Sequence, residues 1–390
     1  RVIRAFCRED DEVARIYEAS DKLKDAQAHA GIISALSTPL SGAVINAATV
    51  AVLYFGALEF SVGGITSGEV VALVNYMSQI FIELVKFANL IVQVTRAAAS
   101  AGRIASLFDV RPQLLYPAEE SAGLLDSQKV AVRFEHVGFK YPGAGAESLS
   151  DISFSVRHGD AVGIIGGTGS GKTSLVSLIP RFFDASSGDV YLFGEPIKEI
   201  PRQKLRSLAG IVPQKPLLFS GTVRSNLLWG VSGICPPEEV DDELLWKALE
   251  CAQAAGFVRD LPGGLDGVVE QGGRNFSGGQ RQRLTIARAM VRALLALRAG
   301  QPFILILDDS ASALDFVTES ALRRELAKLR GKVTTFIVSQ RVASVRSSDL
   351  ILVLDDGRLV GAGKHDELLS TCPVYREIYE SQYSGGEAGA

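Results

Sequence analysis

One stretch decides the fold: AVGIIGGTGSGKTSLVSLI, residues 161–179. It begins as a short apolar strand pattern, passes through a turn rich in glycine, and ends in a helical pattern. The turn GGTGSGKT, residues 166–173, fits the spacing G-x-x-x-x-G-K-[ST] in the strand–turn–helix context that this motif needs. Glycines let backbone N–H groups close around phosphate oxygens. The stretch therefore predicts a phosphate-binding loop in an α/β nucleotide-binding fold.

The polar residues of this loop have separate expected roles. Lys172 reaches the terminal phosphates of a nucleotide, and Thr173 ligates magnesium. The apolar run FILIL, residues 303–307, leads into Asp308, a hard oxygen ligand for the same ion. We expect nucleotide binding by Gly166, Thr168, Gly169, Ser170, Gly171, Lys172, Thr173 and Ser174.

From about residue 131 onward, short β-rich runs alternate with helical stretches, a rhythm typical of α/β nucleotide folds. Ahead of the phosphate loop, FKYPG places Tyr141 where it could stack on an adenine base. Alternatively, Tyr141 is an aromatic residue of a turn and contacts no ligand.

Two long apolar segments precede this region. No charged residue occurs from Ala30 to Leu58, a run of 29 positions, whereas about 20 helical residues span a bilayer core. A second segment, at about 70–95, is interrupted only by Glu83 and Lys86. We expect membrane helices at about 30–58 and 70–95. The alternative, two buried helices of a soluble bundle, is disfavoured by so long an uncharged run.

Charge around these segments predicts their orientation. The connecting turn EFSVGGITSGE, residues 59–69, carries two acids and no Lys or Arg, while basic residues flank the pair on both outer sides. By the positive-inside rule both flanks are cytoplasmic. We expect a multi-pass protein of the cell membrane with its nucleotide-binding domain in the cytoplasm.

The composition agrees with a membrane protein and excludes one class of partner. A hydrophobic content of 47% and a mean hydropathy of +0.20 are high for a wholly soluble chain. A formal net charge of −4 and a pI near 5.8 leave no basic footprint, so we expect no nucleic-acid partner. The four cysteines are scattered without metal-ligand spacing and are predicted to be reduced thiols.

A second glycine turn opens a long basic helix in NFSGGQRQRLTIARAM, residues 275–290. Ser277, the amides of Gly278 and Gly279, and the helix N-terminus point toward one place and predict a second anion site. With this motif the chain resembles the nucleotide-binding domain of ATP-binding cassette (ABC) transporters. FSGGQ resembles their signature, GGTGSGKT their Walker A, FILILD their Walker B, Gln214 their Q-loop residue, and SALD, ending at Asp315, their D-loop.

The resemblance extends over nearly the whole chain. RVIRAFCRED, residues 1–10, is similar to the second intracellular loop of ABC exporters, and AAASAGRIASLFD, residues 97–109, to the end of their last membrane helix. Exporter halves of this type carry six membrane helices, so we expect a C-terminal piece that lacks the first four. Its expected partners are the lipid membrane and a transported small molecule.

The resemblance implies a fold class: the last two transmembrane helices of an ABC exporter domain, followed by an α/β P-loop ABC nucleotide-binding domain. We expect the membrane part at 1–108, a linker at 109–130, the nucleotide-binding domain at 131–383 and a disordered tail at 384–390.

The resemblance also implies the cofactors and a shared site. ATP is the expected nucleotide, with Mg²⁺ held by Thr173, Gln214 and Asp308. In the family, two nucleotide-binding domains dimerise head to tail, so that ATP lies between the Walker motifs of one chain and the signature of the other. The residues expected to contact the partner's nucleotide are Ser277, Gly278, Gly279 and Gln280.

Two expected catalytic residues depart from the family pattern: Asp309 replaces the usual Glu, and Gln340 replaces the usual His. An Asp carboxylate is withdrawn by about 1.5 Å, one carbon–carbon bond. A base must lie within roughly 2.6–3.2 Å of the atom whose proton it takes. Gln340 can donate a hydrogen bond but cannot become cationic. Our hypothesis is that this site binds MgATP and hydrolyses it slowly.

The intact signature would then complete the competent site of a different half-transporter. A heterodimer is therefore favoured. A fully hydrolytic homodimer remains the alternative, and a soluble ABC ATPase of DNA repair or translation is a further one that the uncharged segment argues against.

Two features have no assigned function. Residues 291–302, VRALLALRAGQP, make the connection before Walker B longer than the family pattern leads us to expect. Glu83 and Lys86 lie one turn apart in the second membrane segment; they either line a pore or satisfy each other as an i,i+3 pair.

Overall fold

The computed structural model describes residues 2–110, 114–118, 130–231 and 234–383. The chain divides into two compact units, Arg1–Arg111 and Pro112–Ala390. The predicted tail at 384–390 lies outside the described residues, as does most of the predicted linker.

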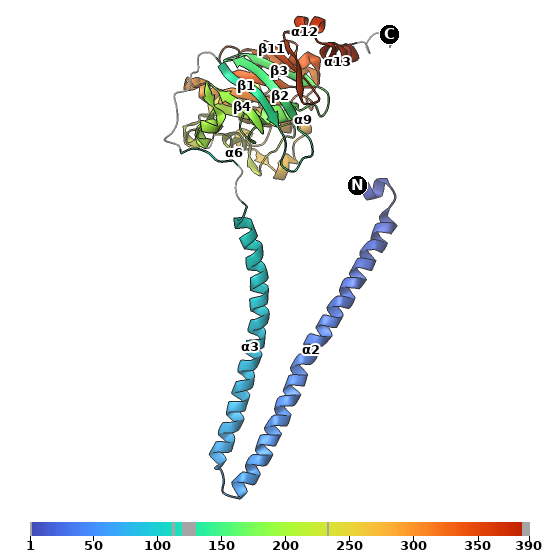
Figure 1. The fold of residues 1–390 in the computed structure, drawn as a ribbon, viewed down its shortest axis with the longest axis vertical. Helices are drawn as coiled ribbons and strands as arrows, with labels where there is room; N and C mark the ends of the chain where they lie inside the picture. Colours follow the sequence, from blue (N-terminus) through green and yellow to red (C-terminus); the bar gives the residue numbers. More distant parts are fainter. Residues whose placement is uncertain (1, 111–113, 119–129, 232–233, 384–390) are drawn as a thin grey trace. The chain divides into compact units, whose positions relative to one another are not determined.

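The first unit is a helical hairpin (Figure 1). Its elements are α1 (Val2–Ala5), α2 (Glu9–Ser61) and α3 (Ser67–Phe108). A capping box begins α3, because the Thr66 N–H donates to Glu69 Oε2 at 2.7 Å and satisfies part of the helix start. Near the turn the helices pack closely, since a Cβ on Gly56 would lie 3.0 Å from Val70 Cγ1.

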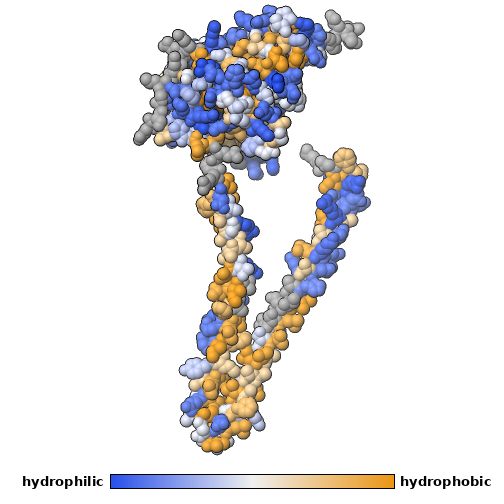
Figure 2. Space-filling view, in the orientation of Figure 1, coloured by the Kyte–Doolittle hydropathy of each residue, from blue (hydrophilic) through white to orange (hydrophobic). Residues whose placement is uncertain are grey.

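Both predicted apolar segments lie inside these helices. The spans long and apolar enough to cross a membrane are Pro39–Ser61 and Ser67–Phe108, and almost none of their surface is buried within the chain. Figure 2 shows the hydrophobic surface along both helices. The helices are therefore not the buried core of a soluble bundle, and such a surface requires lipid or further helices around it.

The hairpin extends beyond the apolar segments as continuous helix. Ahead of the first segment, exposed i,i+4 and i,i+3 ion pairs such as Lys22–Glu18 and Lys24–Asp21 support α2 in water. Within the second segment, Lys86 Nζ donates to Glu83 Oε1 at 2.8 Å. The i,i+3 pair, one of the two alternatives for these residues, is therefore present, and a pore-lining role stays a prediction.

The second unit is built on a six-stranded sheet in the order β12-β11-β3-β10-β9-β6. Its inner pairings are parallel, and only β12 runs antiparallel to its neighbour. Central strands buried on both faces read as continuous apolar runs, which is the pattern seen in the sequence. The strands are β3 (Ala161–Gly166), β6 (Ala209–Val212), β9 (Ile304–Asp308), β10 (Thr334–Val338), β11 (Leu350–Asp355) and β12 (Arg358–Gly363).

A second, antiparallel sheet has the order β2-β1-β4-β5, and a short ribbon pairs β7 with β8. These strands are β1 (Val130–Phe139), β2 (Leu149–Arg157), β4 (Ser187–Leu192), β5 (Glu195–Pro196), β7 (Gly221–Thr222) and β8 (Val268–Val269). The helices of this unit are α4 (Lys172–Leu178), α5 (Arg202–Leu208), α6 (Val223–Leu228), α7 (Asp242–Cys251), α8 (Ala255–Arg259), α9 (Gly278–Arg298), α10 (Phe316–Ala327), α11 (Val342–Val345), α12 (His365–Thr371) and α13 (Pro373–Tyr383). Short 3-10 turns lie at Ile197–Glu199, Pro237–Glu239, Gly264–Asp266 and Gln271–Gly273.

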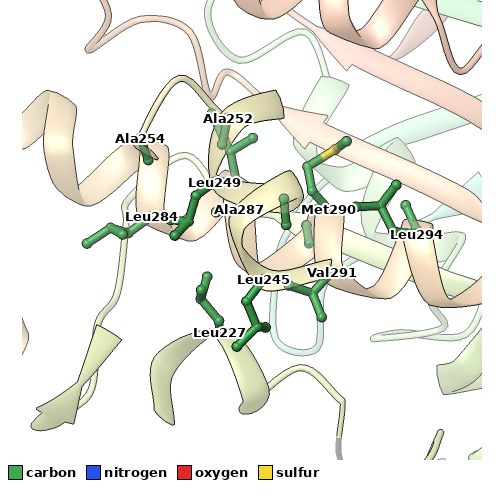
Figure 3. Close-up of a cluster of buried hydrophobic side chains, with 14 of the residues drawn as sticks. Leu227, Leu245, Leu249, Ala252, Ala254, Leu284, Ala287, Met290, Val291 and Leu294 are labelled. Carbon is green, nitrogen blue, oxygen red and sulfur yellow. The ribbon is translucent and has the colours of Figure 1, made fainter. Parts of the chain in front are cut away.

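Helix α9 is held by a buried apolar cluster (Figure 3). Leu284 and Met290 of α9 belong to the same cluster as Leu245 and Leu249 of α7 and Leu227 of α6. The cluster continues through the later turns of α9, where Val291, Ala293, Leu294 and Ala296 are buried. Most of the unassigned connection at 291–302 is thus the second half of a core helix.

Part of the predicted linker lies on the nucleotide-binding unit. Arg181 Nη2 donates to the carbonyl of Leu115 at 2.8 Å, and the Arg181 guanidinium carbon lies 4.5 Å from the centre of the Tyr116 ring. Residues 114–118 are therefore docked at a defined place on the domain.

This packing gives a stability prediction. Leu249 is 0% exposed in the α7–α9 cluster, so Leu249→Ala should lower the free energy of unfolding by about 2–5 kcal/mol. The chain's two tryptophans, Trp229 and Trp246, both lie in this unit, so their fluorescence during denaturant unfolding reports on it alone. The control is Leu217→Ala, at a position 56% exposed. Equal losses in both variants would contradict the assignment of this core.

Candidate functional site

The phosphate loop follows the buried strand β3 and needs glycine at several positions. Gly169 and Gly171 have φ values of +83° and +93°, which side chains other than glycine rarely adopt. A Cβ on Gly166 would lie 2.1 Å from the Leu354 carbonyl oxygen, and one on Gly171 would lie 2.8 Å from that of Ser148. The loop can therefore pack against β11 and β2 only because these side chains are missing.

Three adjacent strands bring the site together. In the parallel register Val338 of β10 pairs with Asp308 of β9 and with Ile164 of β3. Parallel strands present their carboxyl ends at the same edge, which is where ligands bind in open α/β sheets. The loop after β3, the acids at the end of β9 and the segment after β10 consequently meet at that edge.

A cavity of about 350 Å³ lies at this edge. Most of the residues predicted to bind nucleotide line it, including both departures from the family pattern. Its lining is Glu147, Ser148, Thr168, Gly169, Ser170, Gly171, Lys172, Thr173, Ser174, Gln214, Asp308, Asp309, Val338, Gln340, Asp356 and Gly357.

Lys172 folds back over its own loop. Its Nζ donates to the carbonyl of Gly166 at 2.9 Å and to Ser170 Oγ at 3.3 Å, and it also donates to the carbonyl of Gly167. Burial lowers the pKa of Lys172, and the nearby Asp309 and Asp308 oppose that shift. The Lys172 Nζ thus lies at the cavity wall, bonded to carbonyl and hydroxyl groups that a phosphate could replace.

Thr173 and Asp308 form a direct pair. Thr173 Oγ1 donates to Asp308 Oδ1 at 3.1 Å, and Asp308 is only 4% exposed. Burial raises the pKa of Asp308, while the Thr173 hydrogen bond and Lys172 favour the charged form. A hydroxyl and a carboxylate side by side are hard oxygen donors that suit Mg²⁺.

Thr173 and Asp308 alone would not complete the shell of such an ion. Gln214, the third predicted ligand, lines the same cavity, and its role as a ligand stays a prediction. Among the described residues no group of three or more His, Cys, Asp or Glu side chains could hold a metal. Mg²⁺ commonly takes one or two protein oxygens and completes its shell with water and substrate phosphates. The residues present therefore fit MgATP better than a resident metal ion.

Asp309 has a different environment from its neighbour. Its backbone lies in the left-handed region at φ +45°, which Asp tolerates better than most residues, and its N–H donates to the Val338 carbonyl at 3.0 Å. Its Oδ2 accepts a hydrogen bond from Gln214 Nε2 at 3.1 Å. Sequence reasoning missed this contact, which joins residues 95 positions apart in the chain.

Tyr141 and the signature residues are not among the residues that line the cavity, although Tyr141 contacts Ser174, which is. The Tyr141 hydroxyl is 3.0 Å from Ser174 Oγ, and its ring meets those of Phe139 and Phe183 edge to face. Its role in stacking on adenine stays a prediction. Gly166 also lies outside the lining, although its carbonyl accepts from Lys172.

The signature residues form a helix cap. Ser277 Oγ accepts from the Gln280 N–H at 3.2 Å, and Gln280 Oε1 accepts from the Ser277 N–H at 2.9 Å, so a capping box begins α9. Ser277 and Gly278 are exposed, Gly279 is half-buried, and none of them lines this chain's cavity. The fold thus places the two predicted anion sites separately.

Two family descriptions match the chain. Residues 149–312 match the ABC transporter family, and residues 1–84 match the ABC transporter transmembrane region. An uncharacterized ABC transporter ATP-binding protein of Mycobacterium tuberculosis is 38% identical over 389 residues, which cover 100% of this chain and 64% of that protein. A probable multidrug resistance ABC transporter ATP-binding/permease protein of Bacillus subtilis is 35% identical over 392 residues, with the same coverage of each.

A solved structure has the same architecture. The structure of a bacterial Atm1-family ABC exporter with ATP bound has a TM-score of 0.82 and 28% sequence identity, and the similarity covers 98% of this chain and 64% of that one. The chain thus spans 64% of the length of these relatives. The predicted fold class, membrane helices followed by a P-loop nucleotide-binding domain, is confirmed. Together with the cavity formed by the phosphate loop and Walker B, these matches show that the chain belongs to the ABC transporters of the exporter type.

Proposed function

We propose that this chain is the ATP-binding and membrane part of an exporter half-transporter that uses ATP to move a hydrophobic or amphipathic small molecule outward across the cell membrane. The observation that carries the proposal is that Lys172 and the Thr173–Asp308 pair share one cavity with the phosphate loop. The same chain carries two apolar helices of bilayer length. The name of the multidrug resistance relative in Bacillus subtilis supports the substrate class.

The residues of the cavity divide the work of binding ATP. Loop amides and Lys172 would neutralise the phosphate oxygens, while Thr173, Asp308 and Gln214 would hold Mg²⁺. When bound, Mg²⁺ would supply positive charge that stabilises the negative charge developing in phosphoryl transfer to water. Asp309, Gln214 and Gln340 line the same cavity, so they are candidates to contact the attacking water or the terminal phosphate.

Asp309 is poorly arranged to act as a base. One of its carboxylate oxygens accepts from Gln214, and its side chain is one carbon shorter than that of the usual Glu. Gln340 offers no positive charge to the terminal phosphate. We therefore propose that this chain's own site binds MgATP strongly and turns it over slowly.

The second half-transporter supplies the complementary parts of each site. The Ser277–Gln280 capping box lies at an exposed helix start away from this chain's cavity, which supports a role toward the nucleotide of a partner chain. A partner that has Glu at the position of Asp309 and His at the position of Gln340 would hydrolyse ATP at the site that this signature completes. This pairing favours a heterodimer over a homodimer.

Nucleotide binding can be tested at Lys172. Lys172→Ala should weaken ATP binding about tenfold to a hundredfold, because it removes hydrogen bonds from a charged donor to the phosphates. Binding would be measured by titrating the full chain in lipid nanodiscs with a fluorescent ATP analogue and Mg²⁺. Lys332→Ala, at an exposed loop position, is the matched control. Equal affinity of both variants would refute the assignment of the cavity.

Slow turnover can be tested at Asp309. In nanodiscs that hold two copies of the full chain, so that the signature of each copy can complete the other's site, Asp309→Glu should raise single-turnover phosphate release about a hundredfold, the lower end of what a positioned base contributes. Asp309→Asn should change it little, because the Asp already contributes little. A large drop in Asp309→Asn with no gain in Asp309→Glu would show that Asp309 is a working base and would favour the homodimer.

A further inference from the structure

Gln340 reaches the cavity from a short segment between β10 and α11. The start of this segment is fixed by the sheet, since the Ser339 N–H donates to the Ile164 carbonyl at 3.1 Å. The Arg341 N–H then donates to Ser339 Oγ at 3.0 Å. Residues 339–341 lie outside the strands and helices, so the hydrogen bonds at the far end of this segment help to determine where the Gln340 side chain lies.

A side chain from the last helix clamps that far end. Gln382 Nε2 donates to the carbonyl of Gln340 at 2.7 Å, and Gln382 Oε1 accepts from the Val342 N–H at 2.9 Å. One planar amide therefore spans Arg341 with two hydrogen bonds. The second bond also satisfies the first N–H of α11, which its own helix leaves without a partner.

Helix α13, which carries Gln382, is packed against the core of the domain. Tyr375 of α13 is 0% exposed, and its hydroxyl lies 2.8 Å from His365 Nδ1. Tyr375 also packs in a core cluster with Val342 and Val345 of α11. Gln382 itself is exposed at the other end of α13, so it can be changed without opening the core.

On its other side the same segment is fixed by a buried acid. Glu319 of α10, 3% exposed, accepts from Ser344 Oγ at 2.6 Å and from Arg341 Nη1 at 3.3 Å. Helix α10 directly follows the D-loop and is capped by Asp315, whose Oδ1 accepts from the Thr318 N–H. The Gln340 segment is thus held between a buried carboxylate and an exposed amide.

We propose that Gln382 is a positioning residue that holds Gln340 at the terminal-phosphate end of the ATP site. The inference rests on the proposed function, because it requires ATP in the cavity. Lys172, Thr173 and Asp308 place the β and γ phosphates, and Gln340 lines the same cavity. Hydrogen bonds weaken steeply with distance and angle, so a small shift of the segment loses the bond from Gln340 to the γ phosphate. ADP has no γ phosphate, and its binding does not depend on Gln382.

The test compares ATP and ADP affinities of the full chain in nanodiscs, titrated with each nucleotide and Mg²⁺. Gln382→Met removes both hydrogen bonds at similar size, and we expect ATP binding about three- to tenfold weaker with ADP binding unchanged. Gln382→Glu keeps the acceptor for Val342 and should recover part of the loss. Ser381→Ala is the matched control, because among the described residues its hydroxyl donates to the Ile378 carbonyl within α13.

A double variant decides whether Gln382 acts through Gln340. Gln340→Ala should cause the same selective loss of ATP binding, and adding Gln382→Met to it should cause no further loss. If the losses of ATP affinity in the two single variants add up in the double variant, the inference is overturned. It is also overturned if ADP affinity and the unfolding midpoint, measured by tryptophan fluorescence, fall together with ATP affinity, because Gln382 would then have a general structural role. Unchanged ATP affinity in Gln382→Met, with a wild type that prefers ATP to ADP, would also overturn it. A wild type that binds neither nucleotide would refute the proposed function itself.

Discussion

The parallel register of β3, β9 and β10 is the constraint on which the nucleotide site depends. Val338 pairs with both Asp308 and Ile164, so three strands end at one edge of the sheet. The phosphate loop, both acids and the Gln340 segment follow directly from these ends. A slip of one residue in any of the strands would turn its functional side chains toward the opposite face.

Two adjacent acids at the end of β9 acquire different chemistry from their surroundings. Asp308 is buried and bonded to Thr173, which makes it an oxygen donor beside the phosphate loop. Asp309 leaves the strand in a left-handed conformation and is bonded to Gln214. The proposed Mg²⁺ ligand therefore lies at the end of a buried strand, whereas the residue proposed to activate water lies on the turn after it and is bonded to Gln214. This difference is the basis of the proposal that the site binds ATP and turns it over slowly.

Much of this arrangement could be predicted from sequence because it depends on local patterns. The glycine spacing before Lys172, the apolar run before Asp308 and the long uncharged stretch after Ala30 are each readable within a few residues. The Gln214–Asp309 bond and the Gln382 clamp join segments far apart in the chain, and no local pattern announces them. The 291–302 connection was unexplained because its apolar residues have helical spacing only when they are read as part of α9. The Arg181–Leu115 bond likewise depends on tertiary packing.

The central proposal is that this chain binds MgATP and hydrolyses it only slowly. The most direct measurement identifies the nucleotide that stays bound to the chain. The chain alone, in lipid nanodiscs with Mg²⁺, is incubated with ATP, separated from free nucleotide and quenched in acid, and the bound nucleotide is then identified. The account predicts that the retained nucleotide is mostly intact ATP. Mostly ADP, with an equivalent amount of phosphate released, would contradict it.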